Sequence, residues 1–181
     1  ATVIGTRALS PRKAIIMAAI FNLAGAATGT AVAQTIGKGI LIPEAISYQT
    51  VIAALAAVII WTTLATYYGL PVSLTHGFVA AIAAAGFASW VGSGAVNWTK
   101  LGQVLSAVVT APVLGFVGGF LFMVVLLWLF RKSVPSKVRG FFINLQVLSA
   151  AFMAYSHGKN DGQMPIGVIT MALVIYYQGI G

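Results

Sequence analysis

The sequence predicts an all-α, polytopic integral membrane protein with a re-entrant helical hairpin and a broken helix. Of its 181 residues, 60% are hydrophobic and only 7% are charged, and the mean hydropathy is +0.99. Soluble domains carry roughly 25% charged residues, so this composition is typical of a chain that lies mostly in lipid. There is no cysteine, which excludes disulfides and cysteine-based metal sites.

The apolar stretches define the expected helices. They cover, in order, residues 14–36, 48–69, 73–93, 101–130, 141–156 and the residues from 164 onward. Ser10 and Pro11 are a helix-start signal before the first stretch. Small residues such as Gly25 and Gly29 lie within it and predict close packing against a neighbouring helix. The chain begins without an initiator Met and ends within an apolar pattern, which predicts a fragment.

The basic residues predict the topology. Seven of the ten Lys and Arg lie in segments 7–13 and 131–139, which we expect on the cytoplasmic side. This clustering in short loops explains the net charge of +8 without nucleic-acid binding. The stretches between 48 and 93 must then cross the membrane an even number of times. Two full helices satisfy this count, but the tip near Ser73 has no Lys or Arg, which favours a hairpin entering from outside.

The tip of this hairpin is the first candidate site. Pro71 ends the incoming helix, and Ser73 or Thr75 can cap the next one. A helix N-terminus with hydroxyl donors suits an anion such as phosphate or sulfate. Taken alone, the pattern more often indicates a simple cap, and His76 alone more often indicates a hydrogen-bonded core residue.

The second candidate site surrounds Asp161, which is the sole aspartate of the chain. A carboxylate within a bilayer costs about 2.5–3.5 kcal/mol or more, so an intramembrane Asp indicates function by default. Glycines flank the polar residues, and we expect an unwound segment at 158–163 where Asn160, Asp161 and Gln163 offer oxygens to a hard cation. The structural alternative is an ion pair between Asp161 and Lys159 or a distant Arg.

Four segments in this order resemble one known family over nearly the whole chain. They are residues 3–14 (VIGTRALSPRKA), 29–40 (GTAVAQTIGKGI), 71–76 (PVSLTH) and 156–163 (SHGKNDGQ). They are similar to the inorganic phosphate transporter (PiT) family, whose members carry a Gly-Ala-Asn-Asp signature in each of two inverted repeats and a Pro-Val-Ser-Thr-Thr-His hairpin. Two residues depart from that pattern: Leu74 replaces a hydroxyl residue, and Lys159 replaces a small residue.

The resemblance implies a multi-pass transporter of the prokaryotic cell membrane that carries inorganic phosphate with Na⁺ or H⁺. Residues 1–130 would be a partial first repeat with the hairpin near 48–93, residues 131–139 a basic cytoplasmic linker, and residues 140–181 the start of the second repeat. Sulfate is the alternative substrate. A passive anion channel and a scaffold subunit are the alternatives from other classes. We expect no enzyme, because no carboxylate pair or nucleophile–base arrangement is visible.

The resemblance also implies residue roles. Ser73 and Thr75 would bind phosphate, while Asn160, Asp161 and Gln163 would form the coupling-cation site or shape a joint site. If the coupling ion is Na⁺, its ligands would be Asp161 and Asn160, and we expect no other cofactor. Weaker candidates are His76, His157, Lys159 and Asn22. The expected partners are phosphate, Na⁺ or H⁺ and the lipid bilayer, and a homo-oligomer stays open.

Overall fold

The computed structural model describes residues 2–180, apart from the side chains of residues 178 and 180. Over this range the chain is helical, and its extended contacts are limited to an isolated antiparallel bridge between Leu41 and Val96. The elements are α1 (Thr2–Gly5), α2 (Pro11–Ala27), α3 (Ala31–Gln34), the π-helix η1 (Thr35–Gly39), η2 (Pro43–Ala45), α4 (Tyr48–Tyr67), α5 (Leu74–Phe87), η3 (Gly92–Ala95), α6 (Trp98–Phe130), α7 (Pro135–Asp161) and α8 (Gln163–Ile180). The predicted all-α class is confirmed.

Several helices are long and apolar enough to cross a membrane. They are Tyr48–Tyr67, Trp98–Phe130 and the combined run Pro135–Tyr177, with a fourth if α2 and the α3–η1 helix form one bent span. A bilayer core about 30 Å thick requires about 20 helical residues, and each of these runs meets that length. The chain is therefore a multi-pass membrane protein, as predicted.

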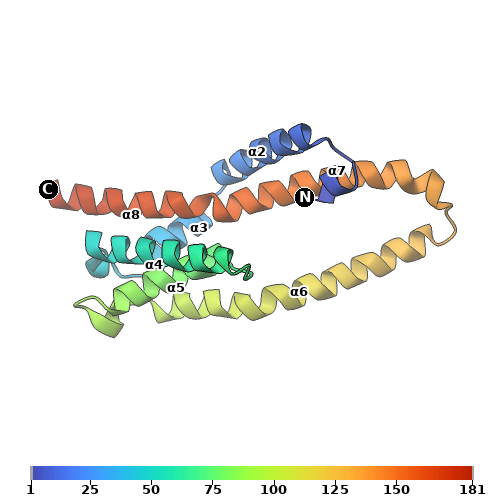
Figure 1. Ribbon diagram of the computed structural model, residues 1–181. Coiled ribbons are helices and arrows are strands. Elements are labelled where there is room, and N and C mark those ends of the chain that lie inside the picture. Colours follow the sequence, from blue (N-terminus) through green and yellow to red (C-terminus); the bar gives the residue numbers. More distant parts are fainter. Residues whose placement is uncertain (1, 181) are drawn as a thin grey trace.

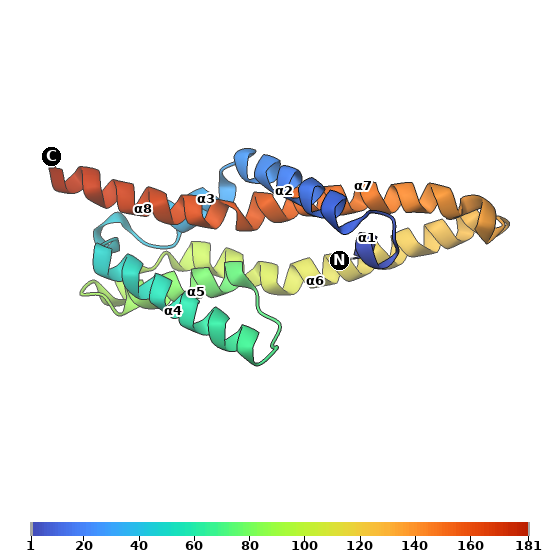
Figure 2. The same ribbon diagram turned by 45° about the horizontal axis from the view of Figure 1, so that its top comes forward.

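Helices α7 and α8 form a nearly continuous run along the whole molecule, as Figures 1 and 2 show. Gly162 separates them, but it keeps right-handed helical angles (φ −66°, ψ −22°), and its N–H still donates to Gly158 O at 3.0 Å. The expected unwound segment at 158–163 is therefore wrong. Gly158 and Gly162 serve close packing instead. The interruption of the helix is limited to Gly162, and the Asp161 carbonyl lacks an i+4 partner because residue 165 is proline and has no N–H.

The broken helix lies in the first apolar stretch, which we expected to be continuous over 14–36. Helix α2 ends at Ala27, and the chain bends by 55° before continuing through α3 and η1. Gly29 permits the bend because its φ of +107° is open to glycine and strained for other residues. The prediction of a broken helix is confirmed, but the break is at residues 28–30.

Close glycine contacts hold α2 against α7. A side chain at Gly158 would collide with the backbone of Asn22, and one at Gly25 would collide with the backbone of Tyr155. Small residues allow this approach, and membrane helices gain stability from such packing because lipid supplies little hydrophobic drive between them. The α2–α7 pair thus fixes the first apolar stretch against the Asp161 segment.

The predicted hairpin is formed by α4 and α5, which lie side by side in Figures 1 and 2. Ser47 caps α4 by accepting a hydrogen bond from Thr50 N at 3.2 Å. Helix α5 has 14 residues, about 21 Å of helix, which is less than the thickness of the bilayer core. The buried core lies between this hairpin, η1 and α8. Its largest members include Ile36, Ile40, Leu41, Val51, Val58, Phe78, Ile82, Met164 and Met171.

Helix α6 connects the hairpin to the α7–α8 run. It has 33 residues, runs through Pro112 without ending, and has no buried residue in the described structure. The following turn occupies residues 131–134, and α7 begins at Pro135, so part of the expected linker 131–139 is helical. The division into two repeats stays a prediction.

Candidate functional site

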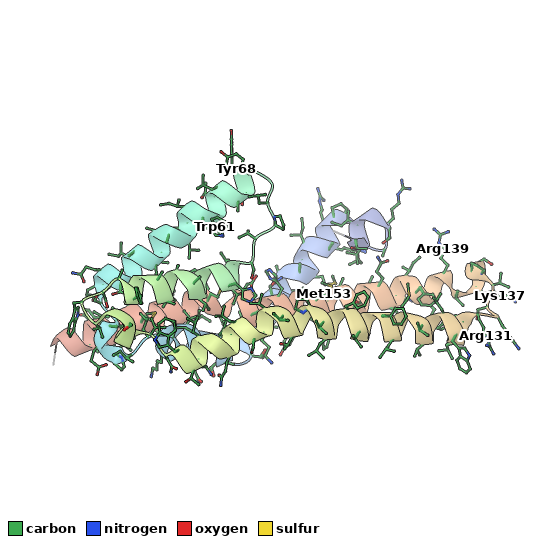
Figure 3. All side chains as sticks on the ribbon, turned by 90° about the horizontal axis from the view of Figure 1, so that it is seen from below. Trp61, Tyr68, Arg131, Lys137, Arg139 and Met153 are labelled. Atoms are coloured by element: carbon green, nitrogen blue, oxygen red, sulfur yellow. The ribbon has the colours of Figure 1, made fainter. Side chains whose placement is uncertain are left out.

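The two candidate segments predicted from the sequence meet in the structure. Helix α5 begins beside the middle of the α7–α8 run (Figures 1 and 3). Ser73 is its N-cap, and the Ser73 hydroxyl oxygen accepts a hydrogen bond from His76 N at 3.4 Å. Thr75, in the first turn, donates from Oγ1 to Asp161 Oδ1 at 3.1 Å. The hairpin tip and the Asp161 segment are therefore one site, which we call the Thr75–Asp161 juncture.

The second oxygen of Asp161 faces a histidine one helical turn earlier. His157 Nε2 lies 3.1 Å from Asp161 Oδ2, and the Asp161 side chain is 32% exposed. The other ring nitrogen, Nδ1, lies 2.8 Å from Asn22 Oδ1, and Asn22 Nδ2 donates to Ala18 O at 2.8 Å. Two weaker candidates, His157 and Asn22, thus connect α2 to the carboxylate: Asn22 is hydrogen-bonded to His157, and His157 contacts Asp161.

Gln163 lies apart from the Asp161 carboxylate. Its side chain is 1% exposed and closes the α2–α3 break, where Oε1 accepts from Val32 N at 3.1 Å and Ala33 N at 3.5 Å. Its Nε2 donates to Gly29 O at 2.5 Å. Residues two apart on a helix do not face each other, so Gln163 and Asp161 serve different neighbours. The amide supplies partners to backbone groups that the bend leaves without helical ones.

The remaining predicted residues have open surroundings. Asn160 is exposed and makes no side-chain hydrogen bond within residues 2–180. The Lys159 side chain passes beside Gly29 at the α2–α3 break. In the described part of the chain, the side chain that contacts the second oxygen of Asp161 is His157, and neither Lys159 nor an arginine forms a salt bridge with Asp161. His76 is exposed, with its backbone N–H bound to Ser73.

The sequence reasoning missed the residues of the α2–α3 break. Thr28 Oγ1 lies 2.6 Å from the Tyr155 hydroxyl, and Gly29 supplies the carbonyl that Gln163 binds. The sequence feature that could have indicated this break is a glycine between two threonines, at residues 28–30, within an apolar stretch. Glycine next to hydroxyl residues indicates a helix interruption as well as it indicates packing.

The oxygen atoms of the juncture are of the kind that hard cations prefer. They are the carboxylate oxygens of Asp161 and the hydroxyl oxygen of Thr75. Among residues 2–180, no three His, Cys, Asp or Glu side chains gather in a way that would hold a metal ion through those groups. Oxygen ligands are what hard cations prefer.

The buried position of Gln163 leads to a stability prediction. Gln163→Met should lower the thermal unfolding midpoint of the purified full-length protein, because the N–H groups of Val32 and Ala33 would lose their acceptor. An unsatisfied buried group costs about 1–3 kcal/mol. Gln103→Met, at an exposed position on α6, is the matched control and should leave the midpoint unchanged. Equal midpoints for both variants would contradict the proposed closure of the break.

Comparison with known proteins agrees with this fold, which is that of a multi-pass helical membrane protein. The model of the phosphate transporter family matches residues 1–180, so the chain belongs to that family. The "Probable low-affinity inorganic phosphate transporter" of Bacillus subtilis (strain 168) is 40% identical over 176 residues, which are 96% of this chain and 53% of that protein. The protein of the same name from Rhizobium meliloti (strain 1021) is 35% identical over 180 residues, 99% of this chain and 53% of that one.

A solved structure is also similar. It is called "The sodium-dependent phosphate transporter" and matches with a TM-score of 0.64 and 28% sequence identity, over 97% of this chain and 47% of that one. The chain thus spans about half the length of these relatives. All of them are named as transporters, which agrees with the expectation that the chain is not an enzyme.

Proposed function

We propose that the chain is part of a secondary transporter that moves inorganic phosphate together with Na⁺ or H⁺ across the cell membrane. Membership of the phosphate transporter family and the names of the relatives support phosphate as the substrate. The name of the structural neighbour supports sodium as the coupling ion. The observation that carries the proposal is the 3.1 Å contact between Thr75 Oγ1 and Asp161 Oδ1.

This contact places the expected anion site next to a negative charge. Two unit charges about 4 Å apart interact by ~4 kcal/mol at an effective dielectric constant of about 20, so Asp161 alone would repel phosphate from the start of α5. A cation bound to Asp161 removes this repulsion. Phosphate and the cation therefore favour each other's binding, which is the thermodynamic basis of coupled transport.

Each residue then has a specific role. Ser73 and Thr75 donate hydroxyl hydrogens to phosphate oxygens, and Thr75 becomes free to do so when a cation replaces its hydrogen bond to Asp161. The Ser73 hydroxyl already accepts from His76 N, which leaves its own hydrogen available. Asp161 and Asn160 hold the cation. Gln163 shapes the site indirectly by fixing the α2–α3 break.

Transport measurements on the full-length protein test the proposal. Uptake of radiolabelled phosphate and of radiolabelled sulfate would be compared in proteoliposomes under an imposed Na⁺ gradient, an imposed pH gradient, and neither. We expect phosphate uptake driven by one of the gradients. Greater uptake of sulfate than of phosphate would identify sulfate as the substrate. Phosphate uptake that is independent of both gradients would favour a passive channel.

The hydroxyl residues of the hairpin tip lead to a kinetic prediction. The double variant Ser73→Ala/Thr75→Val should raise the half-saturating phosphate concentration at least about tenfold, because each hydrogen bond from a hydroxyl to the charged phosphate contributes about 1.5–3 kcal/mol. Phosphate uptake as a function of concentration measures this shift. The control variant Thr62→Val removes a hydroxyl that bonds within α4 to Val58 O at 2.7 Å. Unchanged half-saturation in the double variant would exclude both hydroxyls from the phosphate site.

A further inference from the structure

A group of exposed cations lies at the turn between α6 and α7, far from the Thr75–Asp161 juncture. We call these residues the basic turn: Arg131, Lys132, Lys137 and Arg139. Figure 3 shows Arg131, Lys137 and Arg139 projecting from the end of the molecule in different directions. The sequence has only two acidic residues, Glu44 in η2 and Asp161 at the end of α7, and within residues 2–180 neither forms a salt bridge with the basic turn.

An aromatic cluster holds the basic turn in place. Phe130 at the end of α6 packs against Phe141 and Phe142 of α7, with ring centroids 5.8 Å and 5.0 Å away. Helices α6 and α7 are thereby joined directly beside the turn. The contacts between these rings restrain the backbone of the turn that carries the four cations, so the backbone loses less conformational freedom when a ligand binds there.

The flank of the basic turn is suited to the membrane interface. The guanidinium carbon of Arg131 lies 5.0 Å from the centroid of the Trp128 ring. Tryptophan is enriched at the level of lipid headgroups, and a long basic side chain extends toward the same level. Below it, Leu127, Leu129 and Phe141 are exposed on the two helices and offer an apolar surface to acyl chains.

From this arrangement we propose that the basic turn binds the phosphate headgroups of anionic phospholipids, with their acyl chains against α6 and α7. Charge complementarity supports this occupant. Each Lys or Arg near an anionic membrane surface raises affinity roughly fivefold, and clusters of four or more basic residues beside a membrane helix are typical of anionic-lipid recognition. The inference is independent of what the juncture transports.

Native mass spectrometry of the purified full-length protein tests this proposal. The protein would be mixed with phosphatidylglycerol or with the zwitterionic phosphatidylcholine, and retained lipid would be counted. We expect wild-type protein to retain phosphatidylglycerol preferentially. In the variant Arg131→Gln/Lys132→Gln/Lys137→Gln/Arg139→Gln, the ratio of retained phosphatidylglycerol to retained phosphatidylcholine should fall at least about tenfold, because four cations are removed.

The matched control is Lys38→Gln/Lys100→Gln, which removes two cations from η1 and α6 at positions away from the turn. It should keep the preference for phosphatidylglycerol. Equal retention by wild-type protein and the four-fold variant would overturn the proposal, as would an equal loss in the control. A third arm adds inorganic phosphate: displacement of phosphatidylglycerol by millimolar phosphate would identify a free-phosphate site instead of a lipid site and would also overturn it.

Discussion

Asp161→Asn is expected to reduce cation-driven phosphate uptake at least about tenfold at limiting cation concentration, while the full-length protein still inserts into the membrane. Asparagine keeps the shape of the side chain and can still accept from Thr75, but it removes the negative charge on which the cation depends. A hydrogen bond or ion contact with a charged group contributes about 1.5–3 kcal/mol, so the loss corresponds to about a ten- to hundredfold weaker cation site.

The measurement is gradient-driven phosphate uptake in proteoliposomes, normalised to the amount of protein in the membrane. Glu44→Gln is the matched control, because Glu44 is the only other acidic residue and lies in η2, apart from the juncture. It should transport normally. Near-normal coupled uptake by Asp161→Asn would refute the cation role of the carboxylate.

Gly158→Ala is expected to lower the thermal stability of the protein markedly. A methyl group at this position would collide with the backbone of Asn22, so α2 and α7 would have to separate. Overpacking of this kind costs about 1–3 kcal/mol. At an uncrowded helical position the same substitution would raise stability, because alanine is favoured over glycine in a helix by ~1 kcal/mol.

Gly118→Ala on α6 provides that comparison, because a side chain there would meet no atom within 4 Å in the described chain. Its unfolding midpoint should be unchanged or slightly higher. The two variants would be compared by thermal unfolding of the purified full-length protein and by its yield from membranes. A stable Gly158→Ala protein would show that the α2–α7 contact is looser than the structure indicates.

The sequence was sufficient to predict the hairpin, and the family resemblance added a joint site with the Asp161 segment as one of two options. Pro71 and Ser73 are local signals of a helix end and a helix start, and a lone aspartate in an apolar stretch is a strong signal of a polar site. The contact between Thr75 and Asp161 joins residues 86 positions apart. Local signals do not predict a contact over that distance in the chain, and the family resemblance left open whether the two segments form separate sites or a joint one.

The position of the helix break could not be predicted in the same way. Both Gly29 and Gly162 stand beside polar residues, and the sequence favoured Gly162 because Asp161 is adjacent to it. Whether each glycine interrupts its helix depends on the residue packed against it from another part of the chain. Gly162 packs against Ala26, and the space there admits a helical backbone without a side chain. Gly29 lies opposite Gln163, whose amide forms hydrogen bonds with backbone groups at the bend. Such tertiary compensation overrides local composition.

The closure of the α2–α3 break by Gln163 has a mechanical consequence. Gln163 and Asp161 are separated by one residue on the α7–α8 run, so a rotation of this run about its axis displaces both side chains at once. A rotation that moved the carboxylate away from Thr75 would therefore also move the Gln163 amide relative to Gly29. The bend in the first apolar stretch and the Thr75–Asp161 contact thus depend on the rotational position of one helical run.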